Sequence, residues 1–169
     1  MTDLMTPPPA LPIRPASPAD LDPLARLWQQ GWNNAHAAFV PADLLQYRTL
    51  NSFRARLDAY GDRLRTAGPP GAPLGLCAIK PDELDQLYVA PDAQGTGLAA
   101  RLLADGETRL AAQGTTRAHL LCLKENARAA RFYERQGWSN LGVREEALDT
   151  AEGPYPIKLF RFEKSLDLA

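Results

Sequence analysis

The sequence predicts a mixed α/β domain, in which strands and helices alternate along the chain. Apolar, strand-like runs occur at 74–79, 84–89 and 118–123, and helical patterns follow the second and third of them. A short glycine loop, Gly95-Thr96-Gly97, joins the strand at 84–89 to its helix. The 169 residues, 45% of them hydrophobic and 23% charged, suffice for one domain with an ordinary core.

The N-terminal end is expected to hold a tail and a short strand. Residues 1–10 include Pro7-Pro8-Pro9 and lack an apolar signal core, so we interpret them as a flexible, proline-rich tail. A single domain is predicted over 11–169, and its first strand is predicted at 11–14.

Two helices are predicted next. Ser17-Pro18-Ala19-Asp20 supplies an N-cap, a first-turn proline and an acidic third residue for a helix that runs through Trp28, with Trp32 just beyond it. Pro41 opens a second helical stretch, which Gly61 ends. The apolar positions of this second stretch are Leu44, Leu45, Leu50, Phe53 and Leu57.

The remaining elements follow from turn and cap signals. A short strand is expected before the turn Pro69-Pro70-Gly71. A helix is expected to begin at about Gly97 and to stop at Gly114, and Asn126 is expected to cap another. The closing strands are predicted at 141–147 and 155–162.

The glycine loop has the properties of an anion site. A strand that delivers a Gly-X-Gly turn to a helix N-terminus presents free backbone N–H groups and the positive end of the helix dipole, which suit a pyrophosphate. The dinucleotide fingerprint needs a third glycine where this chain has Ala100, and the nucleotide P-loop needs a Gly-Lys pair that the chain lacks. The loop therefore predicts a phosphorylated cofactor of a different kind.

Two motifs resemble those of the GNAT superfamily, the acyl-CoA-dependent N-acyltransferases. The first is Gln-X-X-Gly-X-Ala, formed by Gln94, Gly97 and Ala99. The second is Asn-X-X-Ala-X-X-Phe-Tyr, which begins at Asn126 and precedes Gly137-Trp138. Either Ala129 or Ala130 could fill its alanine position. The two motifs occur in the family's order, separated by one helix and one strand.

The resemblance implies a particular fold and cofactor. It implies a central mixed, mostly antiparallel sheet of about seven strands flanked by four helices, whose fourth and fifth strands are parallel and splay apart to leave a cofactor cleft. Acetyl-CoA is the implied cofactor, with coenzyme A as product. The residues expected to bind it are Leu87, Tyr88, Val89, Gln94, Gly95, Thr96, Gly97, Leu98, Ala99, Asn126, Ala130, Phe132 and Tyr133.

Acyl transfer to an amine makes three chemical demands. A lysine-like amine, with a pKa of about 10.4, must lose a proton before it can attack. The thioester oxygen needs a hydrogen-bond donor as charge develops on it. The departing thiolate benefits from an acid. By resemblance, Tyr133 is the acid at sulfur and Asn126 binds the pantetheine arm. Asn126, Ala130 and Tyr133 share one helix face, which would let them contact one ligand. A backbone N–H between Leu87 and Val89 is expected at the carbonyl oxygen.

Two carboxylates compete for the role of general base. Glu83 and Asp85 alternate with apolar or neutral residues, so both side chains should lie on one face of the strand. Glu83 falls where the family often has a glutamate and is the favoured base, with Asp85 as its rival. A water chain or a carboxylate near the C-terminus serves instead in many family members.

The acceptor cannot be read from the residues alone. His36 is predicted in a link between the first two helices, a region that includes Trp32 and lines the acceptor site in many relatives. The acidic cluster Asp82, Glu83 and Asp85 mildly favours a cationic amine. Small amines, aminoglycoside-like drugs, protein N-termini and lysines all remain candidates, and so does a donor with a longer acyl chain.

Composition narrows the partners. A net charge of −1 gives no general electrostatic case for nucleic acid, and no apolar run approaches the length of a membrane span. Cys77 and Cys122 lie in apolar runs and are interpreted as free thiols of a cytoplasmic protein. Two distant histidines and these cysteines do not make a metal site. Many GNAT domains pair, so a homodimer is compatible with the resemblance.

Two functions are compatible with these motifs. The first is an N-acetyltransferase in which a primary amine attacks the thioester directly in a ternary complex, since no reactive thiol is placed for a covalent intermediate. The second is an acyl-CoA-binding sensor or regulatory module that keeps the fold and does little chemistry. Turnover with amines discriminates between them.

Overall fold

The computed structural model describes residues 10–167, so nearly all of the predicted tail lies outside the described residues. Its centre is one seven-stranded sheet in the order β1-β2-β3-β4-β5-β7-β6. Neighbouring strands are antiparallel except β4 and β5, which are parallel. The mixed, mostly antiparallel sheet is therefore confirmed. The strands are β1 (Ile13–Pro15), β2 (Leu64–Ala67), β3 (Gly75–Lys80), β4 (Glu83–Val89), β5 (Arg117–Cys122), β6 (Ser139–Thr150) and β7 (Gly153–Ser165).

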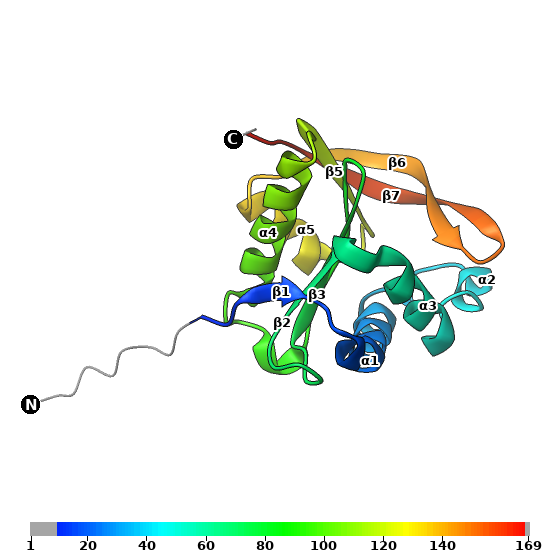
Figure 1. The fold of residues 1–169 in the computed structure, drawn as a ribbon. Helices are drawn as coiled ribbons and strands as arrows, with labels where there is room; N and C mark the ends of the chain where they lie inside the picture. Colours follow the sequence, from blue (N-terminus) through cyan, green and yellow to red (C-terminus); the bar gives the residue numbers. More distant parts are fainter. Residues whose placement is uncertain (1–9, 168–169) are drawn as a thin grey trace, which may run out of the picture.

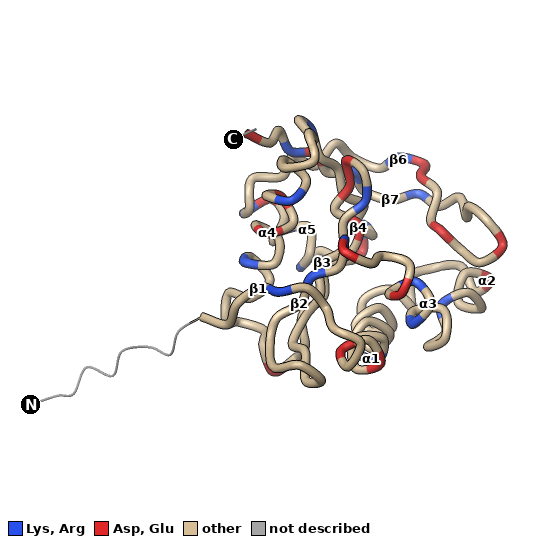
Figure 2. The backbone as a smooth tube through the Cα atoms, in the orientation of Figure 1, with Lys and Arg blue, Asp and Glu red and all other residues tan. Residues whose placement is uncertain are grey.

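Helices cover both faces of the sheet (Figure 1). One core packs α4 and α5 against the sheet, and a second core packs α1 and α3 against its other face. The helices are α1 (Pro18–His36), α2 (Ala42–Leu45), α3 (Leu50–Tyr60), α4 (Leu98–Ala112) and α5 (Ala127–Arg135). Acidic and basic residues are interspersed along the chain (Figure 2). Within residues 10–167, no helix combines the length and the apolar character needed to cross a bilayer.

The predicted helix start at Ser17 is confirmed, and it anchors the first strand. Asp20, the third helical residue, is fully buried and accepts hydrogen bonds from the Ser17 backbone N–H at 2.7 Å and the Gly71 N–H at 3.0 Å. The Arg14 guanidinium donates to both of its oxygens, at 2.7 and 3.0 Å. Arg14 is the main reason that the pKa of Asp20 is strongly lowered. The cap thus joins β1, α1 and the loop before β3.

The helical region before β2 differs from the prediction in two ways. The stretch predicted from Pro41 to Gly61 is two helices, because the chain leaves the helix after α2 and Thr49 caps α3, accepting from the Ser52 N–H at 3.2 Å. Residues 10–167 therefore contain five α-helices, one more than expected. The first helix also continues to His36, so Trp32 and His36 lie within α1 and not in a link.

Gly31 allows α1 to approach the sheet closely. A Cβ at this position would lie 2.7 Å from Cδ1 of Tyr88 on β4. Glycine is needed at this position of the helix because the Tyr88 ring occupies the space that a side chain would fill. This contact brings the last turns of α1, with Trp32 and His36, over β4.

The two closing strands are longer than predicted. Pro154 falls in the turn between the two predicted closing strands, yet it belongs to β7, as does Pro156. That half of β7 pairs only with β6, since β5 pairs with β7 from Phe160 onward. A missing N–H on an unpaired edge costs the sheet nothing, so the prolines are tolerated. The β6–β7 hairpin consequently extends past the sheet toward α2 and α3 (Figure 1).

The sheet opens between β4 and β5, as the resemblance implied. Their only paired position is Glu83 with His119, and the His119 N–H donates to the Asp82 carbonyl at 2.9 Å. A β-bulge precedes the opening: Leu84 faces Ile79 and Gln86 faces Ala78 on β3, which leaves Asp85 as the extra residue. The bulge reverses the alternation, so Leu84 and Leu87 both pack in the α4 core.

Candidate active site

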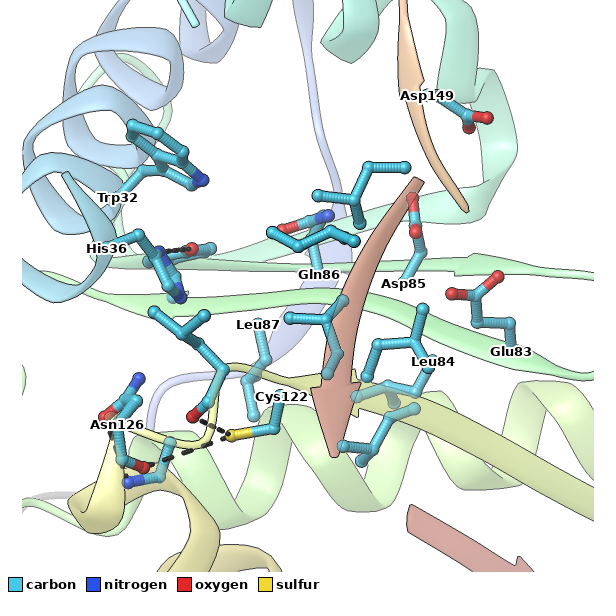
Figure 3. Close-up of a pocket in the computed structure, with 18 of the residues that line it drawn as sticks. Trp32, His36, Glu83, Leu84, Asp85, Gln86, Leu87, Cys122, Asn126 and Asp149 are labelled. Atoms are coloured by element: carbon cyan, nitrogen blue, oxygen red, sulfur yellow. Dashed lines mark hydrogen bonds between the residues drawn. The ribbon is translucent and has the colours of Figure 1, made fainter. Parts of the chain in front are cut away.

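A cavity of about 230 Å³ occupies the place where β4 and β5 separate. Its walls come from both faces of the sheet, because α1 contributes on one side and α5 on the other. The cavity therefore passes through the opening in the sheet (Figure 3). Residues of its lining that the sequence also predicted are Trp32, His36, Glu83, Asp85, Leu87, Tyr88, Asn126 and Tyr133.

The glycine loop precedes α4 and is open to solvent. Gly95 and Gly97 have φ values of +79° and +86°, a left-handed conformation that favours glycine. A Cβ at either position would meet nothing within 4 Å. Among the described residues, the N–H groups of Gly95 and Gly97 have no hydrogen-bond acceptor. The Arg128 guanidinium donates to the Gln94 side-chain oxygen at 3.3 Å, which places a cation from α5 beside the loop.

The other predicted loop positions differ in their surroundings. Thr96 is exposed, whereas Ala99 is half-buried at the start of α4. Leu98 is buried in the core between the sheet and α4. Free amides at the loop and the first turn of α4 together form a cradle that fits a pyrophosphate.

On α5, the structure distinguishes the two candidate alanines. Asn126 caps the helix, and its side-chain oxygen accepts from the Ala129 N–H at 3.3 Å. Ala129 lines the cavity with Asn126 and Tyr133. Ala130 is 8% exposed and belongs to the core instead, so it does not lie on the cavity side with the other two. Phe132 packs against the Tyr133 ring, with centroids 5.3 Å apart.

Tyr133 and Cys122 both keep their protons near neutral pH. Burial strongly raises the pKa of the Tyr133 hydroxyl, and this hydroxyl donates no hydrogen bond to a described residue. Burial raises the pKa of Cys122 to about 12, so its side chain lines the cavity as a thiol. The Tyr133 hydroxyl is thus a protonated group with no partner among the described residues.

Backbone amides of β4 face the opening. The Ala90 N–H donates to the Leu74 carbonyl at 2.8 Å, on the β3 side. Successive N–H groups of an antiparallel strand alternate between its two edges. The N–H groups of Leu87 and Val89 therefore point toward the separated β5, while their side chains pack on the α4 core.

The two carboxylates from β4 lie side by side on the α3 side of the opening (Figure 3). Asp85 accepts a hydrogen bond from the Tyr60 hydroxyl and lies 3.4 Å from the Lys80 ammonium. The His119 Nε2 lies 3.7 Å from the Glu83 carboxylate, and burial lowers the pKa of His119, which favours the neutral ring. Burial and then the charge of Asp85 raise the pKa of Glu83 to about 7. Asp82, by contrast, is exposed in the turn before β4 and does not line the cavity.

Trp32 and His36 form the wall opposite these carboxylates (Figure 3). Their ring centroids are 5.6 Å apart. Burial lowers the pKa of His36 to about 4, which leaves the ring neutral near pH 7. Its Nδ1 lies 3.5 Å from the Tyr88 hydroxyl.

Sequence reasoning missed three charged residues of the lining. Arg48, Arg56 and Lys80 line the cavity, together with Asp149 from β6. From the sequence, the acidic cluster at 82–85 predicts only negative charge at the acceptor site. The structure adds three cations to the lining of the same cavity. No metal-type cluster of three or more His, Cys, Asp or Glu side chains occurs in the part of the chain from 10 to 167.

Solved structures share this arrangement of sheet and helices. The GCN5-related N-acetyltransferase from Rhodopseudomonas palustris is 21% identical, with a TM-score of 0.71 over 94% of this chain and 97% of that chain. The yncA protein of Salmonella typhimurium, solved with its cofactor acetyl-CoA, is 18% identical, with a TM-score of 0.65 over 94% and 95% of the two chains. At these identities the likeness shows the fold alone, which is that of the N-acetyltransferases.

Comparison of the sequence with known proteins identifies the family. The family described as "Acetyltransferase (GNAT) family" matches residues 26–138, more than half of the chain. A curated relative, "Probable N-acetyltransferase Rv2775" of Mycobacterium tuberculosis, is 28% identical over 138 residues, covering 73% of this chain and 77% of the relative. The chain belongs to the GNAT acetyltransferase family, as the two motifs implied.

Proposed function

We propose that this protein transfers the acetyl group of acetyl-CoA to a primary amine, by direct attack of the amine in a ternary complex. The observation that carries the proposal is the cavity through the opened sheet, which connects the α5 residues on one face with the half-buried carboxylates on the other. A donor can enter from the loop side and an acceptor from the α3 side, and the two can meet without a covalent enzyme intermediate.

The loop and α5 fit the donor. The exposed amides of Gly95 and Gly97 and the first turn of α4 would bind the pyrophosphate. Asn126 and the open edge of β4 would bind the pantetheine arm. Acetyl-CoA, which supplies an activated acetyl thioester, is also the cofactor of the yncA structure.

Glu83 is our candidate for the general base. Of the two carboxylates, it is the one without a hydrogen bond from a described residue, while Asp85 is occupied by Tyr60 and faces Lys80. A pKa of about 7 lets Glu83 accept a proton from the amine near neutral pH. Asp85 contributes negative charge that raises this pKa and favours a cationic amine beside it.

The remaining roles are the hydrogen-bond donor to the thioester oxygen and the acid at sulfur. The N–H groups of Leu87 and Val89 are aimed at the gap, where they can donate to the thioester oxygen as charge develops on it. As the amine nitrogen bonds to the carbonyl carbon and the carbon–sulfur bond breaks, Glu83 takes the amine proton. Tyr133, which lines the cavity, would give a proton to the departing sulfur.

The base assignment predicts a pH profile. A base must be deprotonated to act, so kcat/KM is expected to rise about tenfold per pH unit below pH 7 and to level off above it. In Glu83→Gln, the inflection near pH 7 should disappear and kcat should fall about 10²-fold. Rates are measured by release of the free CoA thiol between pH 5.5 and 9.

A matched substitution separates catalysis from a general charge effect. Glu145 is an exposed carboxylate on β6 that does not line the cavity, and Glu145→Gln should keep the wild-type profile. A Glu83→Gln profile with its inflection still near pH 7 would move the base to Asp85 or a water chain.

One experiment tests the proposal as a whole. The protein is titrated with acetyl-CoA in a thermal-shift assay, with NAD as control, and then offered a panel of primary amines while free thiol is followed. Stabilisation that grows with acetyl-CoA concentration, together with amine-dependent thiol release, is the expected result. Stabilisation without thiol release from any amine would favour the sensor module, and no stabilisation would overturn the donor assignment.

A further inference from the structure

Two arginines form the α3 wall of the cavity. Arg48, in the link between α2 and α3, is 6% exposed, and its Nη1 donates to the Asp149 carbonyl at 3.0 Å. Its Nε is buried and has no acceptor among the described residues. The Arg56 guanidinium lies over the Trp28 ring, 4.4 Å from the centroid. Within residues 10–167 it makes no hydrogen bond or ion pair.

Neither arginine forms an ion pair with a carboxylate among the described residues, although the charge of Asp149 acts on both. Asp149 gives Arg48 only its backbone carbonyl, because its carboxylate pairs with Lys80. Asp85 is held by Tyr60. Burial, and then repulsion from Arg56, lowers the pKa of Arg48 to about 10, which shows that the two cations share one environment. Two guanidinium groups that line one cavity, neither of them in an ion pair with a described carboxylate, favour an anionic ligand there.

The β6–β7 hairpin covers this end of the cavity. The Tyr47 hydroxyl donates to Glu152 at 2.7 Å, and the Tyr155 hydroxyl donates to Asp43 on α2 at 2.6 Å. A second hollow of about 240 Å³ lies between α3 and the hairpin and shares Arg48, Arg56 and Asp149 with the first. A cavity of about 230 Å³ that also admits the acetyl end of the donor fits a small acceptor.

We propose that the acceptor is a small primary amine that also carries a carboxylate, as a free amino acid does. Arg48 and Arg56 bind the carboxylate, and the amine is directed toward Glu83 and Asp85 across the cavity. The inference rests on the proposed acetyl transfer and names its substrate class. It replaces the purely cationic amine that the acidic cluster favoured, because Glu83 and Asp85 share the cavity with an arginine pair.

The first test compares acceptors that differ only at the carboxylate. Each of the standard L-amino acids is offered with acetyl-CoA beside its amide, and spermidine and a short peptide are offered beside them. We expect at least one amino acid to give a kcat/KM about tenfold or more above that of its own amide, a difference that one charge-assisted contact can supply. Equal or better use of the amides, spermidine or the peptide would overturn the proposal.

The second test removes the charge at Arg56. Arg56→Met should raise the KM for the preferred amino acid about tenfold or more, leave its amide unaffected, and so abolish the discrimination between them. Arg54→Met is the matched control, because Arg54 lies on the same helix and pairs outside the cavity with Asp22 and Asp58. Equal losses for the acid and the amide in Arg56→Met would contradict a carboxylate site. If Arg56→Met is unstable, Arg56→Lys keeps the charge but loses the planar fork, and a partial loss of discrimination is expected.

Binding separates this inference from the proposed function. Calorimetry of the amino acids is carried out on wild type and Arg56→Met, each saturated with desulfo-CoA. Binding to wild type that is lost in the variant supports the carboxylate site even where no thiol is released. No binding of any amino acid to wild type, with thiol release from other amines, would refute the site and leave the acetyl transfer standing.

Discussion

Replacing Gly97 with aspartate is expected to remove acetyl-CoA binding. The residue precedes α4 with a φ of +86°, and its N–H has no acceptor among the described residues. Aspartate would add a carboxylate at the proposed pyrophosphate site and would strain a left-handed position. We expect the dissociation constant for acetyl-CoA to rise by about 10² or more, about 2.8 kcal/mol, as measured by calorimetry.

Gly114→Asp is the matched control for this variant. Gly114 follows the other end of the same helix, has a φ of +94°, and likewise has open space around its Cβ position. It therefore reproduces the strain and the added charge without touching the loop. Equal affinity for acetyl-CoA in Gly97→Asp and Gly114→Asp would show that the loop does not bind the phosphates.

Tyr133→Phe should reduce turnover while leaving binding intact. The hydroxyl lines the cavity, keeps its proton because burial raises its pKa, and forms no hydrogen bond to a described residue. Removing it deprives the departing sulfur of an acid but leaves no protein group unpaired. We expect kcat to fall between about 10²- and 10³-fold. The dissociation constant for coenzyme A should change less than about twofold, and Tm should stay within about two degrees.

The informative result is how the loss in Tyr133→Phe divides between kcat and the affinity for coenzyme A. A fall confined to kcat is what a proton donor at sulfur requires. A similar loss in the affinity for coenzyme A would make Tyr133 a packing residue of the pantetheine wall. Unchanged turnover would remove the hydroxyl from the chemistry altogether.

The parts of this site that lie within one local segment were readable from the sequence. The glycine loop follows a strand and precedes a helix, and Asn126 caps α5, because turn and cap preferences depend on a few neighbouring residues. The choice between Ala129 and Ala130 was not readable, since a cap alone does not fix which helix face meets the cavity.

The acceptor end depends on contacts between distant segments. Arg48 is buried because the β6–β7 hairpin reaches it, and its partner Asp149 is 101 residues away in the sequence. That reach in turn depends on Pro154 lying in a strand, which the turn preference of proline argues against. The bulge at Asp85 could not be predicted from the alternation of side chains along the strand, because it inserts one residue into that regular pattern.

The single paired position between β4 and β5 divides the sheet into two ladders, one from β1 to β4 and one from β5 to β7. Backbone pairing joins the two ladders at one position, Glu83 with His119. A change in the angle between them therefore turns about this position, with small displacement there and larger displacement at the Val89 end. The proposed base lies at the paired position, and the amides that face the gap lie toward the end of β4 that is farther from it.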